Sequence, residues 1–173
     1  MPMTTQLKDI QMLLLDVDGV LTDSSITYTD AGEQIKSFNV KDGLGIRMLM
    51  EAGVNVGIVT ARRSRALRHR CDNLGITLVF DGTRNKARAL ELISVSTRIS
   101  TAHIAFMGDD LIDLPAMIRA GFAVTVADAP DEVKIRADMI TDLPGGKGAV
   151  RQVCESILKA KGLWETSVSR FLS

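Results

Sequence analysis

Two aspartates one residue apart, directly after a short apolar run, carry the strongest chemical signal in the chain. Three leucines at residues 13–15 precede Asp16-Val17-Asp18-Gly19. In an open α/β sheet, reactive groups gather in the crevice beyond the carboxyl ends of the strands. The segment therefore predicts a site in which Asp16 is a candidate nucleophile and Asp18 a candidate acid and base.

Three further predicted strand ends carry polar groups, namely Thr60, the stretch from Asp81 to Lys86, and Gly108-Asp109-Asp110. All would lie along one edge of a parallel sheet. A single strand that ends in aspartate says little by itself. Carboxylates, a hydroxyl and a lysine at one edge form a coherent set for metal-assisted phosphoryl transfer. A divalent cation is needed there because it screens the repulsion between a carboxylate nucleophile and a phosphoryl group.

The carboxylates predict a magnesium site. Mg²⁺ prefers hard oxygen ligands, which Asp16 and Asp109 can supply through their side chains and Asp18 through its backbone carbonyl. Asp110 and Asp113 would support these ligands through hydrogen bonds. Both residues also suit the acidic first turn of a helix, and the two roles can coexist.

The remaining roles concern the phosphoryl group itself. Asp16 would attack it to form an aspartyl-phosphate, which splits the reaction into two steps. Asp18 would protonate the leaving alcohol and then deprotonate the attacking water. Thr60 would hydrogen-bond a phosphoryl oxygen, and Lys86 would neutralise charge on both the nucleophile and the transferring group.

The elements that must position these residues alternate between strand and helix patterns. The alternation predicts an α/β fold with a doubly wound, mostly parallel sheet, and the length suggests a single domain over residues 1–173. Short apolar runs predict strands over 12–15, 54–60, 77–80, 103–107, 122–126 and 139–141. Helix patterns cover 43–51, 64–74, 85–97, 111–120, 131–137 and 148–161.

One segment interrupts this alternation. Residues 24–40 hold two β-rich stretches around Asp30-Ala31-Gly32, which predicts a β-hairpin flap directly after the carboxylate turn. An ordinary surface hairpin is one interpretation, and a lid or an oligomer contact beside the site is the other. No motif within the tail over residues 162–173 indicates a role by itself.

Composition excludes several kinds of partner. Lys+Arg and Asp+Glu each number 21, so the chain lacks the positive charge on which nucleic-acid or anionic-membrane binding depends. Cys71 and Cys154 lie far apart inside predicted helices, so we expect buried thiols and a reducing, cytoplasmic setting. Residues 1–11 lack the features of a signal peptide, and no apolar run is long enough to cross a membrane.

The motifs resemble those of the haloacid dehalogenase-like phosphohydrolases. The segment 16–22 is similar to their first motif, Thr60 to the second, Lys86 to the third and the segment 108–113 to the fourth. The resemblance implies a Rossmann-like sheet. It also implies a phosphatase or a phosphomutase, because these members carry a carboxylate at the position of Asp18 where ion-pumping ATPases carry threonine.

The segments 38–46, 60–62, 108–114 and 145–151 also resemble a subfamily without a cap domain. Its substrate is the 8-phosphate ester of an eight-carbon sugar acid, 3-deoxy-D-manno-octulosonate, a precursor of lipopolysaccharide. The resemblance implies a Mg²⁺-dependent enzyme and a homotetramer in which the hairpin and a neighbour's tail complete each site. It places substrate contacts on Asp18, Asn39, Val40, Lys41, Asp42, Gly43, Arg47, Arg62, Arg70 and Lys86.

The chain departs from the family pattern at two positions. Ala61 follows Thr60 where the family usually has glycine, and Lys147 replaces a frequent arginine. Arg47 and Arg70 also suit a solvated helix face. Three alternatives stay open. One is a phosphatase of a nine-carbon ketodeoxy sugar acid phosphate, which differs in small contacts that the motifs do not resolve. Ala61 and the unmatched tail suggest a non-catalytic binding module on the same fold. The third alternative is a phosphomutase. The last is disfavoured because no cap is present to hold an intermediate.

Overall fold

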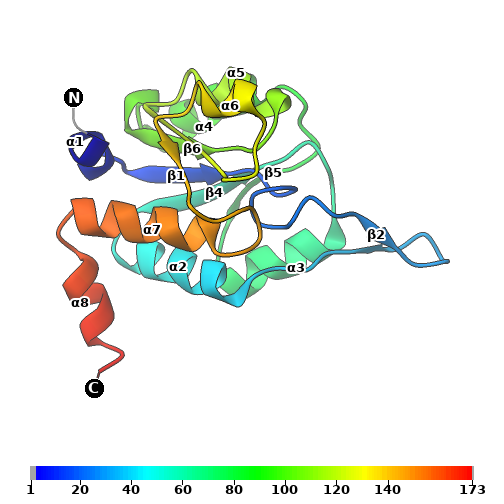
Figure 1. Cartoon of the computed structure of the whole chain (residues 1–173), viewed down its shortest axis with the longest axis horizontal. Helices are drawn as coiled ribbons and strands as arrows, with labels where there is room; N and C mark the ends of the chain where they lie inside the picture. The colour runs from blue at the N-terminus through cyan, green and yellow to red at the C-terminus, as the bar shows by residue number, and fades with distance from the viewer. Residues whose placement is uncertain (1–2, 173) are drawn as a thin grey trace.

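Six short parallel strands form the centre of the computed structural model, which describes residues 3–172 (Figure 1). The strand order is β5-β4-β1-β6-β7-β8, and every neighbouring pair is parallel. The predicted doubly wound sheet is therefore confirmed. The strands span Met12–Leu15 (β1), Asn55–Val59 (β4), Leu78–Phe80 (β5), Ile104–Met107 (β6), Phe122–Thr125 (β7) and Met139–Ile140 (β8).

Continuous apolar sequence forms these strands because helices cover both faces of the sheet. All residues of β1, β6 and β7 are buried. In Figure 1 one layer of helices lies below the sheet and the other above it. The lower layer contains α2 (Val40–Glu51), α3 (Arg65–Leu74) and α7 (Ala149–Ala160), and the upper layer contains α4 (Lys86–Thr97), α5 (Leu114–Met117) and α6 (Asp131–Lys134).

The strand order reverses at β1. From β1 the chain runs to β4 and β5 on one side, then returns to β6, β7 and β8 on the other. The carboxyl ends of β1 and β6 are therefore adjacent at the switch point, where open α/β sheets bind their ligands. Asp16, which follows β1, donates its backbone N–H to the carbonyl of Met107 at 2.9 Å. Asp109 follows β6 after Gly108.

The helix expected over 111–120 is wrong in its details. A 3₁₀ turn over Leu111–Asp113 precedes α5, which ends at Met117. The cause lies in two acidic side chains that tighten the turn. The Asp110 side chain accepts a hydrogen bond from the N–H of Leu111, and the Asp113 side chain accepts one from the N–H of Asp110. The helix expected over 131–137 is also shorter than predicted, and α6 ends at Lys134.

The helix α2 begins at Val40, earlier than expected, because Asn39 caps it. The Asn39 side chain accepts hydrogen bonds from the N–H groups of Lys41 and Asp42, the usual role of an N-cap residue. Asp42 in turn accepts a hydrogen bond from the N–H of Arg151 at 2.8 Å, which joins the first turn of α2 to α7.

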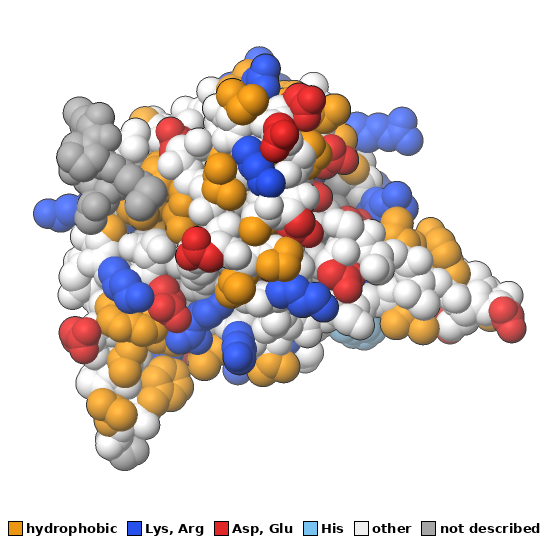
Figure 2. Space-filling view, viewed as in Figure 1, with side chains coloured by type: hydrophobic (Ala, Val, Ile, Leu, Met, Phe, Trp, Pro, Cys, Tyr) orange, Lys and Arg blue, Asp and Glu red, His pale blue; other side chains and the backbone are white. Residues whose placement is uncertain are grey.

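The predicted hairpin flap is present but short. Its strands, Thr27–Tyr28 (β2) and Gln34–Ile35 (β3), pair antiparallel. The hairpin projects from the carboxyl edge of the sheet, on the right in Figure 1. Tyr28 and Ile35 are exposed on it, and Figure 2 shows hydrophobic side chains along this projection. Within residues 3–172, nothing resembling a cap domain is inserted between β1 and β4.

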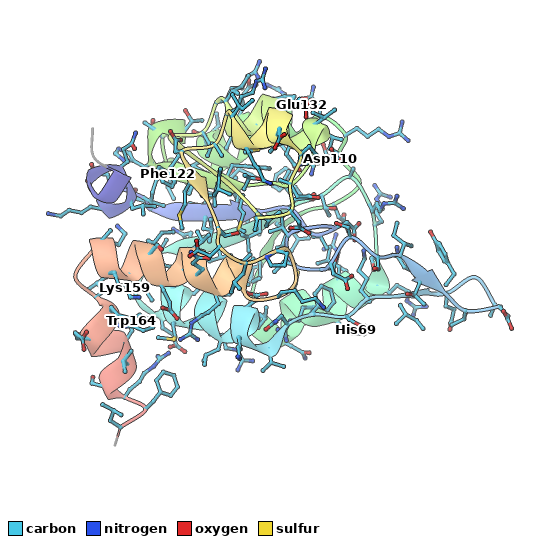
Figure 3. The ribbon with its side chains drawn as sticks, viewed as in Figure 1. His69, Asp110, Phe122, Glu132, Lys159 and Trp164 are labelled. Carbon is cyan, nitrogen blue, oxygen red and sulfur yellow. The ribbon has the colours of Figure 1, made fainter. Side chains whose placement is uncertain are left out.

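Two short helices near the termini were not expected from the sequence, α1 (Met3–Lys8) and α8 (Trp164–Ser169). Trp164 lies under two cationic side chains of α7, with the Lys159 Nζ 4.9 Å and the Arg151 guanidinium 5.7 Å from its ring centre. Lys159 and Trp164 are adjacent in Figure 3. The predicted tail over 162–173 thus contains α8, and Ser173 lies outside the described residues.

Both cysteines are buried and reduced, as predicted. Burial raises the pKa of the Cys71 thiol to about 11, so this thiol stays protonated near neutral pH. No helix within residues 3–172 has the length and apolar character needed to cross a bilayer.

Phe106 in β6 tests how much the buried core contributes to the stability of the fold. This side chain is fully buried, so Phe106→Ala is expected to lower the free energy of unfolding by about 3–5 kcal/mol. Val95→Ala on α4 is the control, because Val95 is 78% exposed and its truncation should cost about 0.5 kcal/mol or less. Urea denaturation measures both, and equal losses would contradict the described core.

Candidate active site

A buried lysine lies between two aspartates at the carboxyl edge of the sheet. Lys86 begins α4, and its side chain has no solvent exposure. Its Nζ lies 2.9 Å from Oδ1 of Asp16 and 2.5 Å from Oδ1 of Asp113. A buried ammonium requires such partners, because an unpaired buried charge is strongly unfavourable. Lys86 therefore joins the end of β1 to the loop that follows β6.

Asp113 organises that loop. Its second oxygen, Oδ2, accepts hydrogen bonds from the backbone N–H groups of Asp109 at 3.1 Å and Asp110 at 3.2 Å. The Asp113 side chain is completely buried. Asp113 thus holds the loop that presents Asp109, and its support of a bound metal stays a prediction. Asp110 is exposed and lies at the carboxyl edge, where Figure 3 labels it.

Asp109 carries the buried oxygen that lacks a partner at the site. Among the described residues, no group donates a hydrogen bond to its Oδ1. Carboxylate oxygens of Asp16, Asp109 and Asp113 all lie within 4.8 Å of one another. Because Asp113 is already engaged by Lys86 and two N–H groups, Asp16 and Asp109 are the side chains best placed to bind a cation. Hard oxygens without donors match the ligand preference of Mg²⁺.

Two glycines allow the close packing around these carboxylates. Gly19 has a φ of 95°, and a Cβ there would overlap the Asp109 carboxylate. Gly145 lies so near the carbonyl of Gly19 that a Cβ would overlap it. Gly146 also donates its N–H to the carbonyl of Val20 at 2.9 Å. The loop over 145–148 therefore lies directly against the turn that carries Asp18.

The electrostatics of the site favour a bound cation. Burial, together with the negative charges of Asp16 and Asp113, raises the pKa of Asp109 to about 8. Burial and the charge of Asp113 also raise the pKa of Asp16, to about 6, although Lys86 opposes the shift. Burial works against the charged form of Lys86, but attraction to Asp16 and Asp113 outweighs it and raises the pKa of Lys86. Positive charge beside Asp109 would relieve this repulsion.

Asp18 faces a different set of charges. Its Oδ1 accepts a hydrogen bond from Nζ of Lys36, and its Oδ2 lies 3.6 Å from Nε of Arg62. Its carboxylate is not part of the cluster formed by Asp16, Asp109 and Asp113. That Asp18 would offer only its backbone carbonyl to a metal stays a prediction.

Thr60 and the residues after it form another wall of the site. Thr60 donates its backbone N–H to the carbonyl of Phe80. The Oγ1 of Thr60 accepts a hydrogen bond from the N–H of Arg62 at 3.4 Å. Ala61 lines the same open cavity, which has a volume of about 350 Å³. The lining residues are Asp16, Asp18, Ser24, Ile26, Thr60, Ala61, Arg62, Lys86, Asp109, Asp110, Ile112 and Asp113.

Several predicted substrate contacts lie outside this cavity. Val40, Gly43, Arg47 and Arg70 line a separate hollow at the start of α2. Arg47 donates to the carbonyl of Asn73, and Arg70 donates to that of Asn39 at 3.0 Å. The side chains of Asn39 and Asp42 serve as helix caps, and Lys41 is exposed. A single chain therefore does not bring these residues to the carboxylates, and their contact with substrate stays a prediction.

Lys36 contacts Asp18, and the sequence analysis did not assign it to the site. The hairpin was expected beside the site, but no residue of its return strand was assigned to it. A lysine that follows a short β-rich stretch resembles any exposed hairpin lysine, so only its position in space distinguishes it. Ser24 and Ile26 were missed for the same reason, and both line the cavity from the base of the hairpin.

Comparisons with known proteins identify the family of this chain. A family model described as haloacid dehalogenase-like hydrolase matches residues 79–152. The 3-deoxy-D-manno-octulosonate 8-phosphate phosphatase of Salmonella typhi is 42% identical over 158 residues, which cover 91% of this chain and 84% of that protein. The chain therefore belongs to the haloacid dehalogenase-like hydrolases, and within them to the family of these octulosonate phosphate phosphatases.

Two solved structures extend the comparison. The crystal structure of the 3-deoxy-D-manno-octulosonate 8-phosphate phosphatase from Moraxella catarrhalis, in complex with magnesium, phosphate and KDO, has a TM-score of 0.95 at 38% identity and covers 97% of both chains. The cobalt-bound phosphatase from Haemophilus influenzae has a TM-score of 0.93 at 41% identity and covers 97% of this chain and 99% of that one. The predicted family and fold are confirmed.

The raised pKa of Asp109 predicts how pH affects stability without metal. Between its unfolded value near 3.8 and its folded value of about 8, the native state holds a proton that the unfolded state has lost. The free energy of unfolding of the metal-free protein should therefore fall as pH rises from 5 to 8. Added Mg²⁺ should raise Tm more at pH 8 than at pH 6, because it binds the ionised carboxylate.

Thermal unfolding with a chelator and with Mg²⁺, at four pH values, measures both effects. Asp109→Asn removes the titrating group and should flatten both dependences relative to the unchanged protein. An identical pH dependence in the variant and the unchanged protein would contradict the assignment of the raised pKa to Asp109.

Proposed function

We propose that this chain is a Mg²⁺-dependent phosphatase that hydrolyses 3-deoxy-D-manno-octulosonate 8-phosphate to the free sugar acid and phosphate. The observation that carries the proposal is the convergence of Asp16 and Asp109, with its unpartnered buried oxygen, beside the buried Lys86. The similarity to named phosphatases of this substrate supports the same assignment. We place the enzyme in the cytoplasm, in lipopolysaccharide precursor synthesis, as a single-domain protein.

The proposed metal site consists of the carboxylates of Asp16 and Asp109 and the backbone carbonyl of Asp18. When bound there, Mg²⁺ supplies positive charge that screens the repulsion between Asp16 and the substrate phosphate. Asp113 keeps Asp109 in place through the loop N–H groups. Lys86, with no exposure to solvent, provides fixed positive charge beside the nucleophile.

In the first step a carboxylate oxygen of Asp16 forms a bond to phosphorus, and the bond from phosphorus to the sugar oxygen breaks. Asp18 gives its proton to that oxygen, which leaves as an alcohol. In the second step Asp18 takes a proton from a water that attacks the aspartyl-phosphate. Phosphate leaves and Asp16 is restored. Thr60 and Lys86 hold the phosphoryl oxygens in both steps.

The remaining predicted contacts suggest an assembly. Arg47 and Arg70 lie outside the cavity of their own chain, and in an assembly they would be free to face the site of a neighbouring copy. The exposed Tyr28 and Ile35 on the projecting hairpin support such a neighbour. We therefore retain the homotetramer with sites at subunit interfaces as part of the proposal.

Replacement of the nucleophile tests the proposed chemistry. Asp16→Asn should reduce phosphate release by about 10³-fold or more, because the amide cannot form the intermediate. Asp131→Asn is the matched control, since Asp131 is an exposed carboxylate on α6. This variant should release phosphate at the same rate as the protein without substitutions. A colorimetric phosphate assay measures both. An Asp16→Asn variant with normal turnover would refute the nucleophile assignment.

A substrate panel tests the specificity. Rates on the eight-carbon and nine-carbon ketodeoxy sugar acid phosphates, with Mg²⁺ and with a chelator, should favour the eight-carbon ester and require the metal. A preference for the nine-carbon ester would select the alternative phosphatase. No phosphate release from either ester, or from a generic aryl phosphate, would favour a non-catalytic binding module.

A further inference from the structure

The hairpin carries a lysine that lies against the proposed acid and base. Lys36 directly follows β3, and its Nζ donates a hydrogen bond to Oδ1 of Asp18. The Lys36 side chain is only 1% exposed, although it belongs to a projecting hairpin. Lys36 does not line the active-site cavity, whereas Asp18 does. The lysine therefore contacts Asp18 from the hairpin side and not from the side of the substrate.

The two oxygens of Asp18 consequently have different surroundings. Oδ1 is held by the buried ammonium of Lys36, while Oδ2 lies 3.6 Å from the Arg62 guanidinium. Arg62 lines the cavity, and its side chain is 53% exposed. Oδ2 is thus the oxygen on the side where a substrate and a water molecule can approach.

The contact of Lys36 with Asp18 is expected to be persistent. Among residues 3–172, Asp18 is the one carboxylate paired with Lys36. A buried lysine that lost this partner would leave an uncompensated charge, which is strongly unfavourable. The exposed Arg62 has no such constraint, because water can replace the carboxylate. Of the two cations near Asp18, Lys36 is therefore the one able to fix its orientation.

We propose that Lys36 is a positioning residue for the proton transfers of the reaction. By holding Oδ1 it fixes the Asp18 carboxyl so that Oδ2 carries the proton to the leaving oxygen in the first step. The same Oδ2 then receives the proton from the attacking water in the second step. The inference rests on the proposed function, because it assigns an atom to a role that the phosphatase mechanism requires. It also makes the seating of the hairpin a condition for proton transfer.

Two leaving groups distinguish positioning from a merely structural role. A sugar alkoxide needs a proton to leave, whereas 4-nitrophenolate leaves readily without one, so only the first depends on a correctly oriented acid. Single-turnover release of each leaving group isolates the first chemical step. Lys36→Met keeps most of the length of the side chain and removes its charge. It should slow release of the sugar by about 10²-fold and release of 4-nitrophenol by about threefold or less.

Three variants serve as controls. Lys36→Arg restores a cation and should recover most of the lost rate on the sugar phosphate. The double variant Asp18→Asn/Lys36→Met should be no slower than Asp18→Asn alone, because residues that act as one unit are not additive. Lys8→Met removes an exposed lysine from α1, remote from the carboxyl edge, and should leave both rates unchanged.

Several outcomes would overturn the inference. Equal losses on both esters, or additive losses in the double variant, would show that Lys36 only stabilises the hairpin. Normal sugar release in Lys36→Met would show that it has no role. If Lys36→Met does not fold, judged by thermal unfolding, Lys36→Gln provides the same comparison. If the protein without substitutions releases neither leaving group in the presence of Mg²⁺, the proposed function itself is refuted, and the role of Lys36 with it.

Discussion

The burial of Lys86 is the constraint on which the rest of the site depends. A fully enclosed ammonium needs compensating negative charge, and the fold supplies Asp16 just after β1 and Asp113 in the turn after β6. Each of these two aspartates also has a second role in the site. Asp16 lines the cavity, and Asp113 arranges the loop that presents Asp109. One charge cluster thereby fixes the relative positions of three elements that are distant in the sequence.

Asp16 and Asp18 pair with different lysines at this edge. Lys86 pairs with Asp16 at the end of β1, and Lys36 pairs with Asp18 from the hairpin. The proposed nucleophile and the proposed acid and base are one residue apart in sequence, yet each has its own cation. In a continuous strand, residues i and i+2 would lie on the same face, so the turn that follows β1 separates the two carboxylates. The φ of 95° at Gly19 belongs to that turn.

The sequence predicted the parts of this arrangement that depend on local pattern. The apolar runs of β1, β6 and β7 identified the sheet because strands buried on both faces need such runs, and a parallel sheet then brings their carboxyl ends together. Sequence patterns could not predict the contacts that depend on the path of segments outside regular helices and strands. Lys36 reaches Asp18 across a hairpin whose strands have two residues each. The capping side chains of Asn39 and Asp42 depend on where α2 and α7 meet. No structural feature explains the alanine at position 61.

Trp164 has a consequence for optical studies of this protein. It is the only tryptophan in the chain, and it lies under Lys159 and Arg151 where α8 meets α7. Figure 3 shows it at the opposite side of the molecule from Asp110. Intrinsic fluorescence excited at the indole band will therefore report the docking of α8 and the environment of the carboxyl-terminal segment. Trp164 is thus a built-in probe of the tail. Titrations of a ligand that binds at the carboxylates need a different optical probe.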